Sequence, residues 1–188
     1  IAQWTGNGSA RTISDLSFEP DIVWTKCKSH AVDHKFFSRI LGTTKLYEVN
    51  QDRGIFTDAN SLTAFTSNGF SLGTSGDVNT NGRTYSAWCF KCGGAASNNT
   101  KGSITSSVSA NPLGLYSVLS YTGTGSNATV GHGLGKKPAF IWVKEMNDVS
   151  SGSTASGDAT GVDDIAIMFN YMKMLDPDSV VREGEQIL

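Results

Sequence analysis

Three cysteines and two histidines lie at spacings that suit metal binding or redox chemistry. Cys89 and Cys92 form a Cys-x-x-Cys pair, and Cys27, His30 and His34 add further ligand types. A structural zinc site needs four such side chains arranged as a tetrahedron, and the two glycines after the pair would permit the tight turn that zinc requires. The pair itself ends a predicted strand, where residues three apart face opposite sides. We therefore expect reduced, mostly buried cysteines without metal or cofactor, with zinc as the alternative.

A glycine-rich stretch over residues 123–128 (GTGSNA) satisfies the pattern of dinucleotide-binding loops, with Glu145 about 20 residues further on. That pattern works only where a helix begins at the loop and points its N-terminus at the pyrophosphate. The glycines and the proline over residues 131–138 (GHGLGKKP) do not permit such a helix. We interpret the stretch as a turn and predict no nucleotide cofactor.

Carboxylates and one further histidine are the remaining candidates for catalysis. Glu48, Asp52 and Asp58 gather in the segment 41–60, and two carboxylates held about 5 to 9.5 Å apart can cut a glycosidic bond. The alternatives are a solvated acidic loop and a cation site. His132 lies between glycines with no evident nucleophile or orienting carboxylate, so we interpret it as an exposed turn residue. The residues predict no catalytic site.

Five aromatic residues divide into two groups. Trp24, Trp88 and Trp142 lie in apolar strand-like segments and are predicted to be core residues. Trp4 and Tyr121 adjoin glycine-rich turns, where an aromatic face could stack on a sugar or on a neighbouring subunit. They are the predicted ligand-binding residues, and the alternative is that both pack beneath their turns.

The composition excludes several classes of partner. The 188 residues include 23 Ser, 18 Thr and 21 Gly, whereas charged residues make up 17% and the net charge is −2. Such a surface produces no strong field to attract nucleic acid or an anionic membrane. The apolar runs are shorter than the roughly 18 to 20 residues of a membrane span. We expect a soluble protein with no nucleic-acid partner and no membrane insertion.

Short apolar runs separated by turn residues predict an all-β chain. Many short strands favour an antiparallel β-sandwich of jelly-roll type, because each sheet needs a second sheet against its apolar face. The predicted strands are Ala10–Ser14, Asp21–Lys26, Lys35–Ile40, Leu62–Thr66, Phe70–Leu72, Thr84–Lys91, Ser103–Val108, Leu115–Tyr121, Ala128–Val130 and Ala139–Lys144.

An internal repeat relates two segments about 117 residues apart, a spacing that suits tandem β modules. Residues 4–26 (WTGNGSARTISDLSFEPDIVWTK) match residues 121–144 (YTGTGSNATVGHGLGKKPAFIWVK) with one inserted residue, and the match ends at Lys144. The identical pairs are Thr5/Thr122, Gly6/Gly123, Gly8/Gly125, Ser9/Ser126, Thr12/Thr129, Pro20/Pro138, Trp24/Trp142 and Lys26/Lys144. We predict a sandwich over residues 1–147, with a first module over 1–110 and the start of a second related unit over 115–147.

The C-terminal part differs in composition. Residues 148–161 (DVSSGSTASGDATG) read as a flexible linker. A helix is predicted from Asp163 to Leu175, since two aspartates suit its N-terminus and Asp176-Pro177 ends it. Its apolar stripe consists of Ile165, Met168, Phe169, Met172 and Leu175. The predicted helical tail, residues 162–188, either docks on a partner or packs on its own sandwich.

Long motifs resemble a known group of phage proteins. The repeat, the stretch FTDANSLTAFTSNGFSLGTSGDVNTNGRTYSAWCFKCGG and the PDIVW-x-K strand resemble a module that recurs in tail-fibre and other virion proteins of marine and cyanobacterial phages. The resemblance covers residues 3–147. It implies a concanavalin-like or laminin-G-like jelly roll with a structural or host-contacting role, and it implies no catalytic residues. The tail GVDDIAIMFNYMKMLDPDSVVREGE resembles a separate segment of phage internal virion and tail proteins.

Together these observations predict a non-enzymatic component of a phage virion. We expect an external fibre, spike or decoration module on the particle surface, which assembles with copies of itself and other virion proteins and contacts host-surface glycans. A weakly charged, hydroxyl-rich β surface suits many weak polar contacts summed by multivalency. The alternatives are a secreted carbohydrate-binding module and a polysaccharide depolymerase that uses the carboxylates of segment 41–60.

Overall fold

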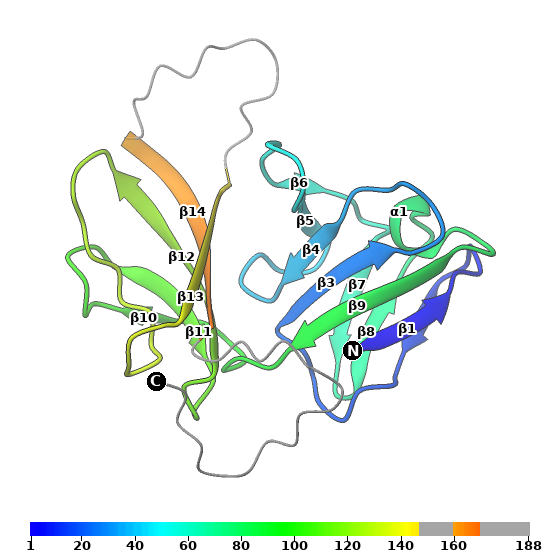
Figure 1. Cartoon of the computed structure of the whole chain (residues 1–188), viewed down its shortest axis with the longest axis horizontal. Coiled ribbons are helices and arrows are strands. Elements are labelled where there is room, and N and C mark those ends of the chain that lie inside the picture. The colour runs from blue at the N-terminus through cyan, green and yellow to red at the C-terminus, as the bar shows by residue number, and fades with distance from the viewer. Residues whose placement is uncertain (147–159, 170–188) are drawn as a thin grey trace.

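A computed structural model describes residues 1–146 and the backbone of residues 160–169. Over these residues the chain is nearly all-β, with antiparallel pairing in each sheet and one short helix, so the predicted all-β class is confirmed. Figure 1 shows two lobes. We call residues 1–92 the first unit and residues 97–146 together with 160–169 the second unit.

The first unit is built on a six-stranded sheet. Across the sheet the strands are β1 (Ala2–Thr5), β9 (Thr84–Phe90), β3 (Ile22–Cys27), β4 (Lys35–Ser38), β5 (Lys45–Glu48) and β6 (Phe56–Thr57). Successive side chains of a strand point to opposite faces. Accordingly, Val23 belongs to one apolar cluster, whereas its neighbours Ile22 and Trp24 belong to another. The sheet is therefore covered on both faces.

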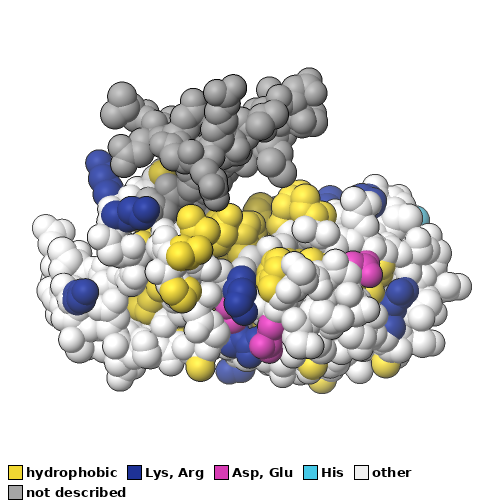
Figure 2. All heavy atoms as spheres, turned by 90° about the horizontal axis from the view of Figure 1, so that it is seen from below, with side chains coloured by type: hydrophobic (Ala, Val, Ile, Leu, Met, Phe, Trp, Pro, Cys, Tyr) yellow, Lys and Arg dark blue, Asp and Glu magenta, His cyan; other side chains and the backbone are white. Residues whose placement is uncertain are grey.

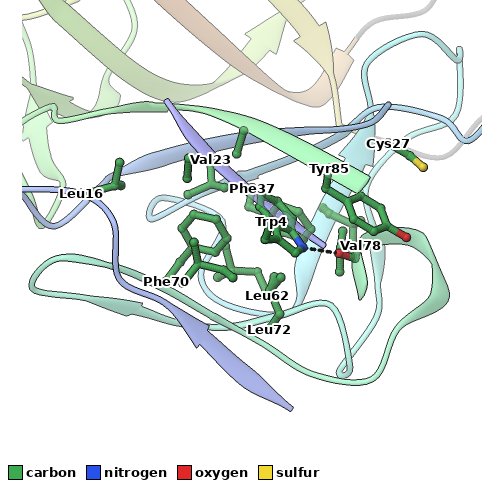
Figure 3. Packing of buried hydrophobic residues seen from close by; sticks show 14 residues of the cluster. Trp4, Leu16, Val23, Cys27, Phe37, Leu62, Phe70, Leu72, Val78 and Tyr85 are labelled. Atoms are coloured by element: carbon green, nitrogen blue, oxygen red, sulfur yellow. Dashed lines mark hydrogen bonds between the residues drawn. The ribbon is translucent and has the colours of Figure 1, made fainter. Parts of the chain in front are cut away.

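A three-stranded sheet covers one of these faces. It consists of β2 (Arg11–Ile13), β8 (Gly69–Leu72) and β7 (Leu62–Thr66), and the short helix α1 (Gly76–Asn79) follows β8. Between the two sheets lies a buried core, part of which is drawn in Figure 3. The core includes Trp4, Val23, Phe37, Leu46 and Tyr85 from the larger sheet and Ile13, Leu62, Phe70 and Leu72 from the smaller one. Two antiparallel sheets around one apolar core make the first unit a β-sandwich.

The second unit adds a third layer. Its five-stranded sheet consists of β10 (Ser97–Asn99), β11 (Ser106–Ala110), β12 (Tyr116–Thr124), β14 (Thr160–Phe169) and β13 (Phe140–Glu145), in that order. Val118 and Trp142 of this sheet pack in one cluster with Ile22 and Phe36 from the second face of the six-stranded sheet. The six-stranded sheet is thus the middle layer of the molecule.

A buried carboxylate holds the connection between the units. Asp21 is 1% exposed and accepts hydrogen bonds from the backbone N–H groups of Cys92 (2.8 Å) and Gly94 (3.2 Å). Its other oxygen accepts from Nε of Arg39 (2.7 Å), which also forms an ion pair with Glu19 (2.6 Å). The start of the connection is therefore fixed to the β3–β4 hairpin.

The internal repeat is also a repeat of strand pairing. In the first unit β9 lies between β1 and β3, and in the second unit β14 lies between β12 and β13. Ala87 of β9 pairs with both Ala2 and Thr25. Leu119, which precedes the second repeat segment by two residues as Ala2 precedes the first, and Val143, the match of Thr25, both pair with Ala166 of β14. The two units therefore share the same three-stranded register, and the structural match extends beyond Lys144, where the sequence match ends.

The predicted helix is wrong for residues 163–169, which lie in β14. The prediction relied on apolar spacing, but a short apolar run also suits a buried strand, and periodicity alone does not separate the two. Here β12 and β13 supply backbone partners on both sides of the run, and this pairing decides the structure. The rest of the predicted tail (170–188) and residues 148–159 of the predicted linker lie outside the described residues.

Most predicted strands correspond to observed ones, and the differences concern short elements. The strands β1, β5, β6 and β10 were not among the predicted strands, and helix α1 is a single turn that had no predicted counterpart. The predicted strand 128–130 is an irregular segment with one bridge between Ile104 and Val130. Within the part of the chain that the structure describes, no helix has the length and hydropathy to cross a membrane.

Candidate functional site

Three tryptophans and a histidine meet at the junction of the two units. This tryptophan cluster consists of Trp24 on β3, Trp88 on β9, Trp142 on β13, and His34 just before β4. The Trp24 ring centroid lies 5.2 Å from that of Trp88, 5.4 Å from that of Trp142 and 6.1 Å from that of His34. Such separations are typical of packed aromatic pairs.

The strands bring these rings together from distant parts of the sequence. Trp24 and Trp88 are directly opposite each other in the antiparallel β3–β9 pair. Trp142 reaches them from the other sheet and also meets the Phe36 ring edge-on at 6.1 Å. Because Trp24 and Trp142 are matched residues of the repeat, the two units contact each other through the same position.

Two polar atoms of the cluster are buried without a hydrogen-bond partner among the described residues, Nε1 of Trp24 and Nδ1 of His34. Burial lowers the pKa of His34, the positive charge of Lys26 lowers it further, and Asp33 opposes the shift. His34 is therefore neutral near pH 7. A ligand that displaces the side chains around these two atoms could accept a hydrogen bond from the indole N–H of Trp24 and bond the imidazole nitrogen of His34.

Trp88 is the accessible part of the cluster, with 37% of its surface exposed. On the face shown in Figure 2, hydrophobic side chains gather in the middle of the molecule, with charged groups around them. An exposed indole beside a second one offers a flat apolar surface to a sugar ring or to another protein.

A polar hollow of about 520 Å³ is lined in part by Asp33, the residue before His34, and by Lys26, two residues after Trp24. Lys35 is almost completely buried there, and its Nζ donates to the carboxylates of Glu48 and Asp77, the latter at 2.9 Å. Burial lowers the pKa of Lys35, but the two carboxylates outweigh it and the net pKa is raised, so the ammonium stays charged. The hollow is lined by Lys26, Ala31, Val32, Asp33, Lys35, Glu48, Asn50 and Asp77.

The rim of the hollow carries an exposed carboxylate and two amides. Oδ1 of Asp33 accepts from Nδ2 of Asn50 (2.7 Å) and Nε2 of Gln51 (2.9 Å). These hydrogen bonds, that of Gln51 first, lower the pKa of Asp33. A charged carboxylate beside amide groups is a set that hydrogen-bonds sugar hydroxyls.

The three acidic residues predicted from the sequence have separate surroundings. Glu48 pairs with Lys35, a contact for which the sequence offered no signal. Asp58 accepts hydrogen bonds from the hydroxyls of Ser61 and Ser75, and Asp52 is exposed. Glu48 and Asp58 are thus engaged in fixed polar contacts.

The structure places the two predicted ligand-binding aromatics in different apolar clusters. Trp4 is 7% exposed, and its Nε1 donates to the carbonyl of Val78 at 3.0 Å (Figure 3). One face of its ring stacks on Tyr85 and the edge of Phe70 meets it from another side. This burial does not fit a stacking role for Trp4, whose ring belongs to the core. Tyr121 is half-buried against a cluster in the second unit that is formed by Val108, Leu119 and Leu134.

Sequence reasoning missed Trp88, which it assigned to the core. Along β9 the inward positions are taken by Tyr85, Ala87 and Cys89, so Trp88 points to the opposite face. The segment YSAWCF is apolar on both faces, and only the packing of the second unit shows which face is partly open.

The three cysteines are free thiols, as expected. Cys27 and Cys92 are buried and Cys89 is half-buried. Burial raises the pKa of Cys89 to about 12 and also raises that of Cys92. Over residues 1–146 and 160–169, no three His, Cys, Asp or Glu side chains are grouped so that they could hold a metal ion.

The glycine-rich segments are turns. Gly8 and its repeat partner Gly125 have φ of 70° and 69°, a left-handed conformation that favours glycine. No helix begins between residues 123 and 146, so the loop lacks the feature on which dinucleotide binding depends. In the next turn Nδ1 of His132 accepts from the backbone N–H of Leu134 at 3.2 Å, which fits a turn residue, but His132 is half-buried and not exposed as predicted.

Comparison with known proteins gives one match. A family model described as a domain of unknown function (DUF7483) matches residues 1–182, so one family pattern spans both the β units and most of the C-terminal part. A search of curated proteins and a search of solved structures gave no match. The chain therefore belongs to the DUF7483 family.

Proposed function

We propose that the chain is a non-enzymatic structural module of a phage virion, displayed as part of an external fibre, spike or decoration. The resemblance of residues 3–147 to tail-fibre modules motivates the virion assignment and a jelly-roll type of sandwich. In this role the chain assembles with copies of itself and with other virion proteins.

The observation that carries the proposal is the packing of one repeat on the other. Two units with the same strand register meet through Trp24 and Trp142, and Asp21 fixes the connection between them. A tandem of β units packed in this way is a rigid spacer, and rigidity lets repeated modules present weak contacts at fixed separations. A rigid spacer of this kind suits a structural role on a particle.

Purified particles test this function. We expect mass spectrometry of gradient-purified virions to find the chain, and cross-linking of intact particles to join it to copies of itself or to other particle proteins. A chain found in infected cells but absent from purified virions would reject the proposal. A known non-virion phage protein serves as the contamination control.

Glycan contact is a second candidate function, favoured by two separate features, the exposed ring of Trp88 and the polar hollow lined by Asp33 and Asn50. A sugar could stack on the indole while Asp33 and Asn50 receive and donate hydrogen bonds to its hydroxyls. A glycan array should then show binding that Trp88→Ala abolishes. The matched control is Leu113→Ala, because Leu113 is 76% exposed in the second unit.

The glycan array can reject the tryptophan cluster as a glycan site, and an assay for reducing sugar can reject the proposal that the chain is not an enzyme. Binding that Trp88→Ala leaves unchanged would eliminate the tryptophan cluster as a glycan site. Release of reducing sugar from a bound polysaccharide, lost in Glu48→Gln, would replace the structural role with a depolymerase.

A further inference from the structure

The amine of Lys35 is buried at the edge of the core of the first unit. Only 4% of the side chain is exposed, and it points to the same face of β4 as Phe37, a core residue two positions further on. Its Nζ lies 5.7 Å from the centroid of the Phe56 ring, which packs against that core. A lysine amine held in this way is a nucleophile once it loses its proton.

Two carboxylates from different elements contact this amine. Nζ of Lys35 donates to Oδ2 of Asp77 at 2.9 Å and also to Oε1 of Glu48. Glu48 lies directly opposite Lys35 in the β4–β5 pair, and 11% of its side chain is exposed. Asp77 comes from α1, where it precedes the core residue Val78 (Figure 3). A nucleophile, a carboxyl carbon and a proton acceptor are therefore brought together at one amine.

We propose that Lys35 and Asp77 become joined by an intramolecular isopeptide bond, and that Glu48 transfers the protons. Glu48 accepts a proton from the ammonium, and the neutral Nζ attacks Cγ of Asp77. The C–N bond forms and one C–O bond of Asp77 breaks. The oxygen leaves as water with the two protons that Nζ gives up, which pass through Glu48. One ammonium and one carboxylate are thus converted into one secondary amide and one water, and Glu48 returns to its original state.

The ion triad of Lys35, Glu48 and Asp77 is the state that precedes this bond. Its ammonium is charged, so the neutral amine is a minor species and the reaction is slow, but each chain has to complete it only once. Proximity compensates in part, because groups held in reacting contact have effective molarities of about 10⁵ to 10⁸ M. The product also removes two charges from a buried place, where charges are costly. All three residues line the polar hollow, through which the water can leave.

The bond would staple the larger sheet of the first unit to the connection between β8 and β9. It closes a loop over residues 35–77, and a covalent loop stabilises a fold by restricting the unfolded chain, as a disulfide does. The three free cysteines provide no such link. This inference concerns the first unit alone and does not depend on the virion assignment.

The intact mass of the full chain tests the bond. After incubation at neutral pH, we expect the parent to be lighter than its sequence by the mass of one water molecule and to migrate faster on a denaturing gel. Asp77→Ala and Glu48→Gln should keep the full mass of their own sequences. Asp33→Asn is the matched control, because Asp33 lines the same hollow but bonds Asn50 and Gln51, and it should lose the water as the parent does.

Tryptic peptide mapping locates the bond. Trypsin cannot cleave after an acylated Lys35, so residues 29–39 should appear joined to residues 54–83 as one branched peptide. A parent that keeps its full mass, or a water loss that maps to other residues, would overturn the inference whether or not the variants fold. Cross-linking of Glu48→Gln at the rate of the parent would remove the proton-transfer role of Glu48. Each of these results would leave the virion assignment standing.

Discussion

Trp24 and Trp142, matched residues of the internal repeat, pack against each other with ring centroids 5.4 Å apart. Each reaches the contact from the same place in its own three-stranded register. The same tryptophan position, repeated in both units, therefore forms the contact between them. Loss of one of these rings should affect the relation between the units more than the fold of either one.

Replacing Trp142 tests this idea. Trp142→Ala removes a half-buried ring that contacts Trp24 and Phe36, and we expect a loss of about 2 kcal/mol in the free energy of unfolding, below the 3 to 5 kcal/mol of a fully buried ring. Calorimetry should show the single transition broadening or dividing in two. Trp88→Ala, at the exposed end of the cluster, should cost about 1 kcal/mol. Equal effects of the two variants would contradict the special role of Trp142.

Trp4 provides a test of core packing in the first unit. Trp4→Ala should destabilise the chain by about 3 to 5 kcal/mol, because the ring fills the space between Phe70 and Tyr85. Trp4→Phe keeps an aromatic ring but loses the hydrogen bond to Val78, and we expect a cost nearer to 1 to 2 kcal/mol. Urea unfolding measures both values. A nearly neutral effect of Trp4→Ala on stability would contradict the burial of the Trp4 ring in the core.

The comparison of sequence and structure shows where local reasoning ends. Strands such as β3 and β9 could be predicted because short apolar runs between turns have few other solutions. The burial of Trp4 could not, because it depends on Val78 and Tyr85, which lie more than 70 residues away in the chain. The strand β14 could not either, since only the presence of β12 and β13 on both sides favours extended backbone over a helix.

The candidate site shows the same limit. The sequence singled out Glu48 but not Lys35 or Asp77, its companions in the polar hollow. Three charges from three separate segments become neighbours only when β4, β5 and α1 are in place. Local patterns predicted the all-β class and most of the strands, whereas long-range pairing determined the third layer and the residues that meet at the surface.

A close backbone approach at Gly69 gives a further prediction. A Cβ atom at this position would lie 1.8 Å from the carbonyl oxygen of Ile13, so Gly69→Ala must push β2 away from β8. We expect a loss of about 3 kcal/mol in stability by thermal unfolding, at the upper end of overpacking costs. Gly76→Ala is the matched control, because its Cβ would meet only the Thr80 hydroxyl at 3.4 Å, and it should be close to neutral.

Asp58 should contribute to the acid dependence of stability. Burial opposes its ionisation, but the hydrogen bonds from Ser61, Ser75 and the backbone of Asn60 outweigh burial and lower its pKa. A carboxyl with a lowered native pKa stabilises the fold above its unfolded pKa, and this contribution is lost as the pH falls through the native pKa. The stability difference between the parent and Asp58→Asn should therefore shrink on acidification from about pH 7 to about pH 3.

Urea unfolding at several pH values measures this change. Ser75→Ala, which removes one donor and keeps the carboxylate, should give an intermediate result. A difference that stays constant with pH would show that the carboxyl of Asp58 contributes nothing through its ionisation.

Cys89 should be unreactive in the folded chain. Burial raises the pKa of its thiol to about 12, and only the thiolate reacts with alkylating agents. At about pH 8 we expect alkylation of Cys89 to be at least ~100-fold slower in the native chain than in urea. Peptide mapping after timed iodoacetamide labelling measures both rates. Rapid native labelling would contradict both the burial and the structural role of this thiol.

Asp21 gives the tandem a mechanical property. Its carboxylate accepts hydrogen bonds from the Cys92 and Gly94 amides and from Arg39. Tension applied to the second unit is therefore transmitted directly to the β3–β4 hairpin. The packed indoles of Trp24 and Trp142 carry part of the same load by a different kind of bond. Force on the second unit is therefore shared between the hydrogen bonds of Asp21 and the packed rings of Trp24 and Trp142. Together these contacts resist rotation of one unit relative to the other.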